Sequence, residues 1–533
     1  MQLTTFAAID VGSNEVSMKI YEVSKKDQIL ELDHVRHTIE LGADTYSIGY
    51  IRHVLVDELC NTLIGFTKKM DEYSVRAYSA CATSAIREAQ NYLLILDQIH
   101  LRSKLKVKIL SNSEQRFLLH KAIALKENDF HTIVQKGTVI VDVGAGSIQL
   151  SIFSNGRLLT TQNIKLGSLR LRELISDLEC PLNDYTSLIS EYIDNDIATF
   201  YELSLRHIEI KHIIAIGENL TEFVRNSFEL FRDGYYDTWD HNEDLSECHN
   251  LGCDRINRSD FSKFYQQLLS TPIDYLSHAL GIPKEQAVLV IPTSMIFYKI
   301  FTMTNAEFMW LPGSTLCDGI VADYAERKSL IHLSHEFHQD IIWAARYIAS
   351  KYQCNPAHFN YVEKMSLFLF DELKKLHGLS KRDRLLLQIA SILHSCGEFI
   401  NMSDSAKNSY NIIMASEIIG LSHNEREMVA SIVKYHSDQI PSTTDHRSYQ
   451  KKGFYITMCK LTAILKIANA LDKSHKQKFN TIKVTIKENE MIMLAKTMKD
   501  ISLEQGLIAK KAYFFEEVYG IRPILKHKKE YLL

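Results

Sequence analysis

The stretch Val139–Ser147, VIVDVGAGS, reads as a buried strand that ends in an aspartate and runs into a glycine loop. In Ile148–Phe153, apolar and polar residues then alternate, and this period of two predicts a second strand that closes a hairpin. The start of the chain repeats the pattern: an apolar strand over Thr5–Ile9, the loop Asp10–Asn14 and an alternating strand over Val16–Tyr21. Two such units predict a duplicated α/β lobe.

Each glycine loop is predicted to bind phosphate. Glycine lets backbone N–H groups approach an anion closely, and successive N–H groups form an anion-binding concavity. The strand-end carboxylates Asp10 and Asp142 can hold Mg²⁺ directly or through water beside those phosphates. The predicted phosphate-contacting residues of the two loops are Gly12, Ser13, Asn14, Gly144, Gly146 and Ser147.

Composition restricts the class of protein. A chain of 533 residues has room for three or four domains, and its net charge of -4 supplies no global positive field for a polyanion. We therefore expect no nucleic-acid partner. Nine irregularly spaced cysteines favour free thiols in the cytoplasm, and we expect no membrane span. The group at His241, Cys248, His249 and Cys253 fits no common zinc spacing and is interpreted as a polar surface insertion.

The predicted fold class is α/β. Residues 1–125 and 126–325 form two lobes, and Leu55, Leu59, Leu63, Phe66 and Met70 mark the buried face of a helix in the first lobe. Helical patterns dominate residues 326–480, and residues 481–533 form a small α+β segment with a β-like pattern over 483–497. The basic stretch Lys526–Lys529 is interpreted as a solvated tail.

Five segments, taken together, resemble the exopolyphosphatase / guanosine pentaphosphatase (Ppx/GppA) family. They are Ala8–Asn14, Ala82–Asn91, Ser113–Arg116, Asp142–Leu150 and Leu166–Leu171. They occur in the family's order and at its spacing. The resemblance implies an actin-like (ribonuclease H-like) two-lobed core and removal of terminal phosphate from inorganic polyphosphate or guanosine pentaphosphate.

The resemblance also implies roles for individual residues. Glu114 would be the general base that activates the attacking water, and Arg87 would bind phosphate through its guanidinium fork. Asp142 would act in catalysis, and Asp10, Asp142 and Gln149 would bind Mg²⁺. From the residues alone, Glu114 also fits a helix cap, because Ser111-Asn112-Ser113 has the composition of an N-cap region. A homodimer is expected.

The sequence departs from the family pattern around the predicted cleft. Gln149 replaces a glutamate, so a metal ligand there would lack charge. Ala145 replaces a glycine, and Ile148 replaces a threonine and loses a hydroxyl donor. Glu15 replaces a serine and adds negative charge, and Ile216–Thr221 stands where the family has a Gly-Gly-Thr loop. These changes predict a loosened or altered active site.

The helical region resembles the HD-type domain of long exopolyphosphatases. His358, His394 and His436 match its pattern, but Ser395 replaces the aspartate of the His-Asp pair, and Asn408 stands where a histidine is expected. The resemblance implies a degenerate metal site, so these histidines are interpreted as structural and the domain as serving dimerisation or retention of a long substrate.

Three hypotheses follow. The first is an active Mg²⁺-dependent exopolyphosphatase, which the presence of Asp10, Arg87, Glu114 and Asp142 favours. The second is a catalytically impaired binding or regulatory protein of the same fold. The third is a sugar or acetate kinase or another actin-like ATPase, but Gly217-Glu218-Asn219 makes a poor nucleotide loop.

Overall fold

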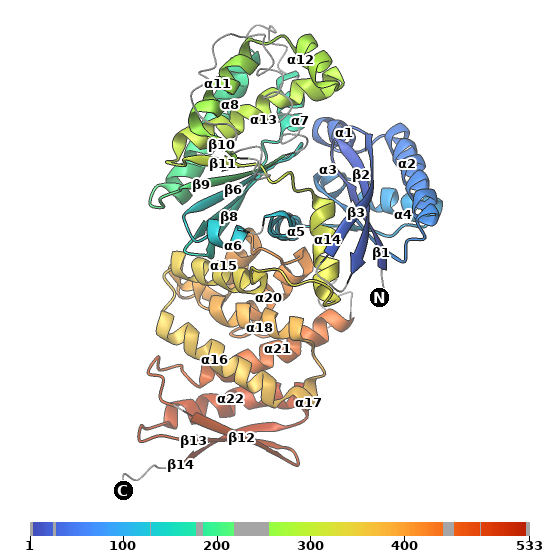
Figure 1. Ribbon diagram of the computed structural model, residues 1–533. Coiled ribbons are helices and arrows are strands. Elements are labelled where there is room, and N and C mark those ends of the chain that lie inside the picture. Colours follow the sequence, from blue (N-terminus) through green and yellow to red (C-terminus); the bar gives the residue numbers. More distant parts are fainter. Residues whose placement is uncertain are drawn as a thin grey trace. The chain divides into compact units, whose positions relative to one another are not determined.

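A computed structural model describes residues 4–24, 28–127, 129–176, 185–217, 255–440, 452–479 and 481–528. The chain divides into two compact units, Met1–Asp340 and Ile341–Leu533. The first unit contains two lobes, each built on its own sheet, and the second unit is mainly helical (Figure 1). The cysteine–histidine group at 241–253 and residues 218–221 of the altered loop lie outside the described residues.

The first lobe has a five-stranded sheet in the order β3-β2-β1-β4-β5. Helices α2 and α4 cover one face, while α14 (Leu316–Arg327) packs on the other and α5 packs against α14 (Figure 1). The predicted apolar face of α2 packs into the core, where Leu59, Leu63 and Phe66 are buried. The elements are β1 (Thr4–Val11), β2 (Glu15–Ser24), β3 (Gln28–Thr38), α1 (Leu41–Ile48), α2 (His53–Glu72), β4 (Ala77–Ala82), α3 (Ser84–Glu88), α4 (Tyr92–Ser103), β5 (Val107–Ile109) and α5 (Asn112–Lys126).

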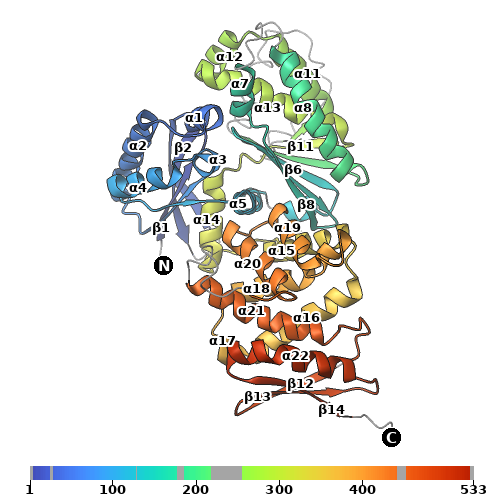
Figure 2. The same ribbon diagram turned by 180° about the vertical axis from the view of Figure 1, so that it is seen from behind.

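The second lobe has a six-stranded sheet in the order β10-β11-β9-β6-β7-β8. Helices α8, α11 and α12 gather around α13 (Figure 2). The elements are α6 (Phe130–Ile133), β6 (Thr138–Val143), β7 (Ile148–Ser154), β8 (Arg157–Ile164), α7 (Ser168–Ser176), α8 (Tyr185–Phe200), the π-helix Tyr201–Leu205, β9 (His212–Gly217), β10 (Arg255–Asn257), α11 (Arg258–Ser270), α12 (Ile273–Leu280), α13 (Lys284–Met303) and β11 (Phe308–Trp310).

The predicted duplication is visible in the strand pairing. In each lobe an antiparallel hairpin, β1–β2 or β6–β7, is extended by a third antiparallel strand, and a parallel strand flanks the first strand of the hairpin. Even the irregularity is repeated, because the register shifts at Ile20/Tyr21 in one lobe and at Ile152/Phe153 in the other. Both shifts lie ten residues beyond the loop aspartates Asp10 and Asp142. The lobes therefore share a bulge as well as a topology.

Helix α14 (Leu316–Arg327) follows the second lobe in sequence but packs on α5 and β1 of the first lobe. Asp318 accepts hydrogen bonds from Lys19 Nζ (3.1 Å) and Tyr21 Oη (2.8 Å), and all three side chains are buried. A Cβ at Gly319 would lie 2.1 Å from the Leu118 carbonyl oxygen, so this helix crossing requires glycine. The first lobe thus includes a helix from far along the chain.

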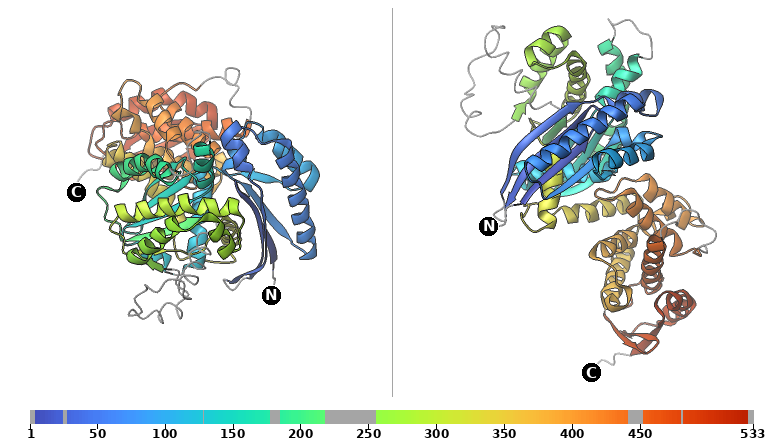
Figure 3. Two further views of the ribbon diagram at one scale, coloured as in Figure 1. Left: turned by 90° about the horizontal axis from the view of Figure 1, so that it is seen from above. Right: turned by 90° about the vertical axis from the view of Figure 1, so that its right-hand side faces the viewer.

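The second unit begins as a helical array and ends in a small sheet. A β12–β13 hairpin forms around Asn489-Glu490 as predicted, and its strands lie beside α22 (Figure 3). The elements are α15 (Phe337–Lys351, which spans the boundary), α16 (Pro356–Glu372), α17 (Lys374–His377), α18 (Lys381–Leu393), a 3₁₀ turn (Cys396–Phe399), α19 (Ser405–Ala415), α20 (His423–Tyr435), α21 (Lys452–Ala470), β12 (Thr481–Lys487), β13 (Glu490–Lys496), α22 (Ser502–Tyr519) and β14 (Arg522–Lys528).

One expectation about local structure is wrong. The stretch from Lys526 to Lys528 is not a solvated tail, because it belongs to β14, which pairs in parallel with β13.

In the described residues, helix α13 is the one helix that is long and apolar enough to cross a membrane. Most of its apolar window, 61%, is buried inside the fold, and Ile296 and Phe297 belong to the core of the second lobe. It therefore has the character of a core helix.

Candidate active site

The two glycine loops close in the same way. Gly12 N–H donates to the Glu15 carbonyl (3.0 Å), and Gly144 N–H donates to the Ser147 carbonyl (3.1 Å). Each bond joins residues on either side of a two-residue hairpin loop. A Cβ at Gly12 would lie 2.6 Å from the Glu15 carbonyl oxygen, so glycine is required for the first closure.

The carbonyl groups of the first loop are held by the segment that enters α1. Gly42 N–H donates to the Ser13 carbonyl (2.8 Å), and Ile39 N–H donates to the Asn14 carbonyl (3.1 Å). Among the described backbone bonds, the N–H groups of Ser13 and Asn14 donate to no carbonyl. The first loop therefore keeps its donors available for an anion.

The second loop is held in the same manner by the start of α7. Ser168 N–H donates to the Gly144 carbonyl (3.2 Å), and Leu169 N–H donates to the Ala145 carbonyl (3.1 Å). The N–H groups of Ala145 and Gly146 have no carbonyl partner among the described backbone bonds. The duplication thus yields two loops whose carbonyl groups are occupied and whose N–H groups donate to no backbone carbonyl among the described residues.

The strand-end aspartates lie close enough to influence each other. Burial, together with the negative charges of Glu15 and Asp142, raises the pKa of Asp10 to about 7. Burial also raises the pKa of Asp142 to about 7, against the opposing charge of Arg116. Two carboxylates held this way favour a proton or a cation between the loops. Glu15 does add negative charge to the site, as its sequence position predicts.

Three side-chain oxygens around these carboxylates are buried without a hydrogen-bond partner in the described residues. They are Asp10 Oδ1, Asn14 Oδ1 and Gln149 Oε1. Gln149 lies directly opposite Asp142 in the β6–β7 register. Carboxylate and amide oxygens are the ligand type that Mg²⁺ takes, and a divalent cation would offset the repulsion between the two aspartates. The residues therefore fit a magnesium ion.

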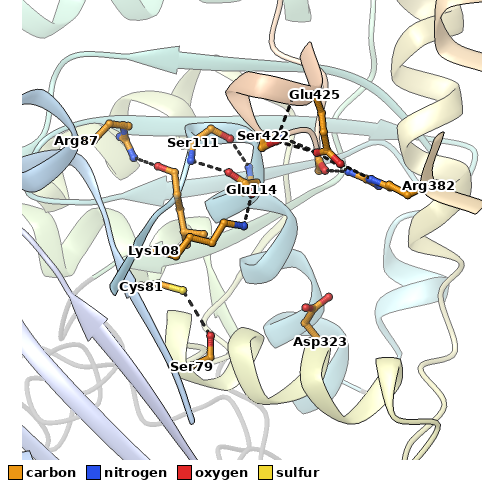
Figure 4. Close-up of polar contacts among 12 residues, drawn as sticks. Ser79, Cys81, Arg87, Lys108, Ser111, Glu114, Asp323, Arg382, Ser422 and Glu425 are labelled. Atoms are coloured by element: carbon orange, nitrogen blue, oxygen red, sulfur yellow. Dashed lines mark hydrogen bonds and ion pairs between the residues drawn. The ribbon is translucent and has the colours of Figure 1, made fainter. Parts of the chain in front are cut away.

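The carboxylate of Glu114 is already engaged. Glu114 and Ser111 form a capping box at the start of α5, in which Ser111 N–H donates to Glu114 Oε2 (3.0 Å) and Glu114 N–H donates to Ser111 Oγ (3.2 Å). Lys108 Nζ contacts Glu114 Oε1 at 2.6 Å (Figure 4). The predicted N-cap region is therefore confirmed. Lys108 is largely exposed, and such an ion pair is weak and readily exchanged.

Arg87 lies beside the same helix start. Its guanidinium donates to the Leu110 carbonyl (2.8 Å) and to Asn112 Oδ1 (2.5 Å), so two of its donors are directed at protein (Figure 4). Cys81 lies opposite Asp10 in the β1–β4 register, and its thiol is influenced by the charges of both Asp10 and Glu114. Burial raises the pKa of Cys81 to about 11, and both carboxylates contribute. The carboxylates of Glu114 and Asp10 therefore both lie within electrostatic range of Cys81.

Sequence reasoning missed three side chains at this site. Arg116 is buried, donates to the Gln162 carbonyl (3.0 Å) and lies near Asp142. Tyr46 Oη contacts Ser13 Oγ at 2.7 Å and Ser84 Oγ at 3.0 Å. Arg116 and Ser84 lie inside segments that resemble the family motifs, and that was the only available signal. No pattern in the sequence marks Tyr46.

Two of the departures from the family pattern are packing residues. Ala145 is buried against Leu169 and Leu289, and Ile148 is wholly buried in the core of the second lobe. A hydroxyl at position 148 would sit among apolar side chains. Among the departures that lie in the described residues, Gln149 and Glu15 are therefore the ones that change the chemistry of the site.

The histidines of the helical unit gather at its centre. His358 and His394 are buried, and His358 Nδ1 contacts Asp472 Oδ2 at 2.9 Å. The ring of His436 stands 5.4 Å from that of His394. In the described part of the chain, no three His, Cys, Asp or Glu side chains converge as a metal-binding group. Ser409, beside Asn408, accepts the Gly397 N–H (2.8 Å).

Comparison with known proteins assigns both units. Residues 20–328 match the Ppx/GppA phosphatase family, and residues 343–512 match its domain III. The chain is 24% identical over 192 residues to exopolyphosphatase 1 of Mycobacterium leprae and 23% identical over 191 residues to that of Mycobacterium tuberculosis. These matches cover 36% of this chain and 55% and 54% of the two relatives, so the chain spans about half the length of the curated relatives it matches.

A solved exopolyphosphatase from Cytophaga hutchinsonii has the same fold. The two structures align with a TM-score of 0.51 at 16% identity, over 62% of this chain and 99% of that one. The two-lobed α/β core predicted from the sequence is therefore confirmed. Because the family match covers more than half of the residues, this chain belongs to the Ppx/GppA phosphatase family.

Proposed function

We propose that the protein is an exopolyphosphatase-type phosphohydrolase that releases terminal phosphate from inorganic polyphosphate. The observation that supports this most directly is the pairing of Asp10 and Asp142, with unpartnered oxygens around them and two donor-rich loops on either side. Such a site suits a phosphate chain with its counter-cation. Family membership favours the same substrate class.

In this proposal the loops bind the terminal phosphoryl group through the N–H groups of Ser13, Asn14, Ala145 and Gly146. Asp10, Asp142, Asn14 and Gln149 would hold Mg²⁺, which neutralises phosphate charge when bound. Glu114 accepts a proton from the attacking water. The water oxygen then forms a bond to the terminal phosphorus as the bridging P–O bond breaks, and the shortened chain leaves.

The hydrogen bonds of the Glu114 carboxylate determine which of its oxygens can accept the proton from water. Its two carboxylate oxygens are held by Lys108 Nζ and Ser111 N–H, so the proton-accepting oxygen is the one that Lys108 releases. The exposed position of Lys108 makes that release inexpensive. Retention of the Ser111 bond would keep the carboxylate oriented.

Gln149 supports a second candidate, a catalytically impaired polyphosphate- or nucleotide-binding protein. An amide oxygen can contact a metal but adds no charge, so Mg²⁺ binding and turnover would be weaker than with an acid. Guanosine pentaphosphate is the second substrate to test. The homodimer and the cytoplasmic location remain predictions, and the six free, buried cysteines of the described residues agree with a reducing compartment.

The test is phosphate release from long-chain polyphosphate, and separately from guanosine pentaphosphate, with Mg²⁺ or with EDTA. We expect metal-dependent release that Glu114→Gln reduces by about a hundredfold or more. The matched control is Glu72→Gln, at an exposed position on α2. A folded protein that binds either compound but releases no phosphate would be the regulatory protein instead.

A further inference from the structure

Tyr46 joins the first loop to the second. Its side chain leaves α1, and its hydroxyl contacts Ser13 Oγ (2.7 Å) and Ser84 Oγ (3.0 Å), which contact each other at 2.8 Å. Ser13 Oγ also accepts the Ala85 N–H (3.2 Å). Three hydroxyl groups therefore form a closed triangle fixed to the first lobe.

The same hydroxyl lies against the second loop. A Cβ at Gly146 would stand 2.0 Å from Tyr46 Oη and 2.7 Å from Ser84 Oγ, so only glycine leaves room for the triangle. Arg170 of α7 stacks on the Tyr46 ring at 4.0 Å and donates from Nε to the Gly146 carbonyl (2.8 Å). Gly146 is thus bounded by the phenol on one side and held by Arg170 on the other.

An ion pair completes this connection between the lobes. Arg170 Nη2 lies 2.8 Å from Glu88 Oε2, at the end of α3 in the first lobe, and helix α1 packs on α7 (Figure 1). Both residues are largely buried, so the bond is less exposed to solvent than a surface pair. Tyr46 is therefore clamped between Ser13 and Arg170.

We propose that Tyr46 is a positioning residue that sets the spacing of the two loops, and through them of Asp10 and Asp142. Ser13 follows Asp10 by three residues and Gly146 follows Asp142 by four, and each lies in the short, closed hairpin loop that its aspartate precedes. A change in loop spacing therefore moves the carboxylates relative to each other. This role rests on the proposed function, because it concerns the same metal and phosphate site.

The competing interpretation makes Tyr46 an ordinary packing residue. Its ring does contact the small apolar cluster of Ala145, Leu169 and Leu289. Packing alone would be satisfied by phenylalanine, because the ring supplies those contacts and the stacking on Arg170. The hydroxyl is the part that reaches Ser13 and Ser84, so its removal separates the two interpretations.

The experiment compares Tyr46→Phe with Tyr50→Phe, a matched control at an exposed tyrosine. Mn²⁺ affinity is measured without substrate from the electron paramagnetic resonance of the free ion, because Mn²⁺ takes the same oxygen ligands. The values of kcat and KM for polyphosphate are measured in parallel. We expect Tyr46→Phe to weaken Mn²⁺ binding and lower kcat, each by about fivefold, which is what one buried hydrogen bond supplies. Tyr50→Phe should behave like the native protein.

The outcomes separate this inference from the proposed function. Native Mn²⁺ affinity and native kcat in Tyr46→Phe, with or without a lower melting temperature, would make the residue structural only and overturn the inference. The inference would also be overturned if the native protein bound no Mn²⁺, or if the Asp142→Asn variant bound Mn²⁺ as tightly as the native protein does. A native protein that binds Mn²⁺ through Asp142 but hydrolyses nothing would refute the proposed hydrolysis and still leave the Mn²⁺ comparison valid.

Discussion

The Nε2 atoms of His358 and His394 face each other at 3.1 Å in the centre of the helical unit. His358 Nδ1 contacts the Asp472 carboxylate, and His394 Nδ1 contacts the Ser391 carbonyl (2.8 Å). Neither oxygen can donate, so both Nδ1 atoms carry protons. Burial and the neighbouring His436 and His358 hold the pKa of His394 well below its usual range, so Asp472 is the charged group that anchors this cluster.

We expect Asp472→Asn to destabilise the helical unit by about 2 kcal/mol, because the buried Asp472 carboxylate accepts hydrogen bonds from His358 Nδ1 and from the backbone and side chain of Gln477, and hydrogen bonds to charged groups are the strong ones. Hydrogen–deuterium exchange in the full chain should show faster exchange of the α16 and α18 amides. Asp404→Asn, at an exposed position whose side chain makes no capping bond, is the control. Native protection of both helices in Asp472→Asn would show that these hydrogen bonds contribute little to the stability of the helical unit.

The aspartate pair predicts a pH dependence of stability in the metal-free protein. The pKa values of Asp10 and Asp142 are raised to about 7 from an ordinary value near 3.8, so the folded state binds more protons than the unfolded state between these limits. The first unit should therefore gain stability as the pH falls from 8 to 5. Melting temperatures in EDTA should show this gain, and Asp142→Asn should reduce it.

Bound magnesium should reduce the gain of stability that the metal-free protein shows as the pH falls. It relieves carboxylate repulsion only where Asp10 and Asp142 are ionised, so it should raise the melting temperature more at pH 8 than at pH 6. Asp142→Asn should remove most of this response, whereas Asp404→Asn should retain it. An equal magnesium effect at both pH values would place the ion elsewhere.

Gln149→Glu should strengthen magnesium binding. The substitution adds a carboxylate where Gln149 Oε1 is buried without a partner, opposite Asp142. We expect the Mg²⁺ concentration for half-maximal thermal stabilisation to fall about tenfold, because ligand charge sets the affinity of such sites. The metal-free variant should melt at a lower temperature, since a third acid adds repulsion. Unchanged Mg²⁺ dependence would exclude position 149 from the site.

Gly146→Ala should be better tolerated when Tyr46 is absent. Its Cβ would lie 2.0 Å from the phenol oxygen, and overpacking of this kind costs about 1–3 kcal/mol. In the Tyr46→Ala background the conflict with the phenol disappears, so the same substitution should cost about 1 kcal/mol less. A double-mutant cycle of unfolding free energies measures the difference. Additive effects would show that the two positions do not contact each other.

The duplicated core could be predicted because both of its signals are local. Alternation over Ile148–Phe153 and over Val16–Tyr21 sets the strands, and glycine at the hairpin ends sets the loops. The aspartates at the strand ends follow directly. The capping box of Ser111 and Glu114 was likewise visible in the sequence, since it spans four residues.

The remaining parts of the site depend on contacts between distant segments. Tyr46 meets Ser84 from 38 positions away, and nothing local to it indicates a hydroxyl partner. The basic stretch in β14 resembled a tail because its partner, β13, lies outside its own sequence window. Pairing of this kind is decided by tertiary structure rather than by local composition.

The packing of α14 on the first lobe has a consequence for synthesis of the protein on the ribosome. Asp318 follows Lys19 by 299 residues, so at ordinary translation rates the partner of this buried lysine emerges roughly 15 to 60 seconds later. During that interval the nascent first lobe lacks the helix that covers β1 and α5. The first lobe therefore cannot complete its packing until residues 316–327 have left the ribosome.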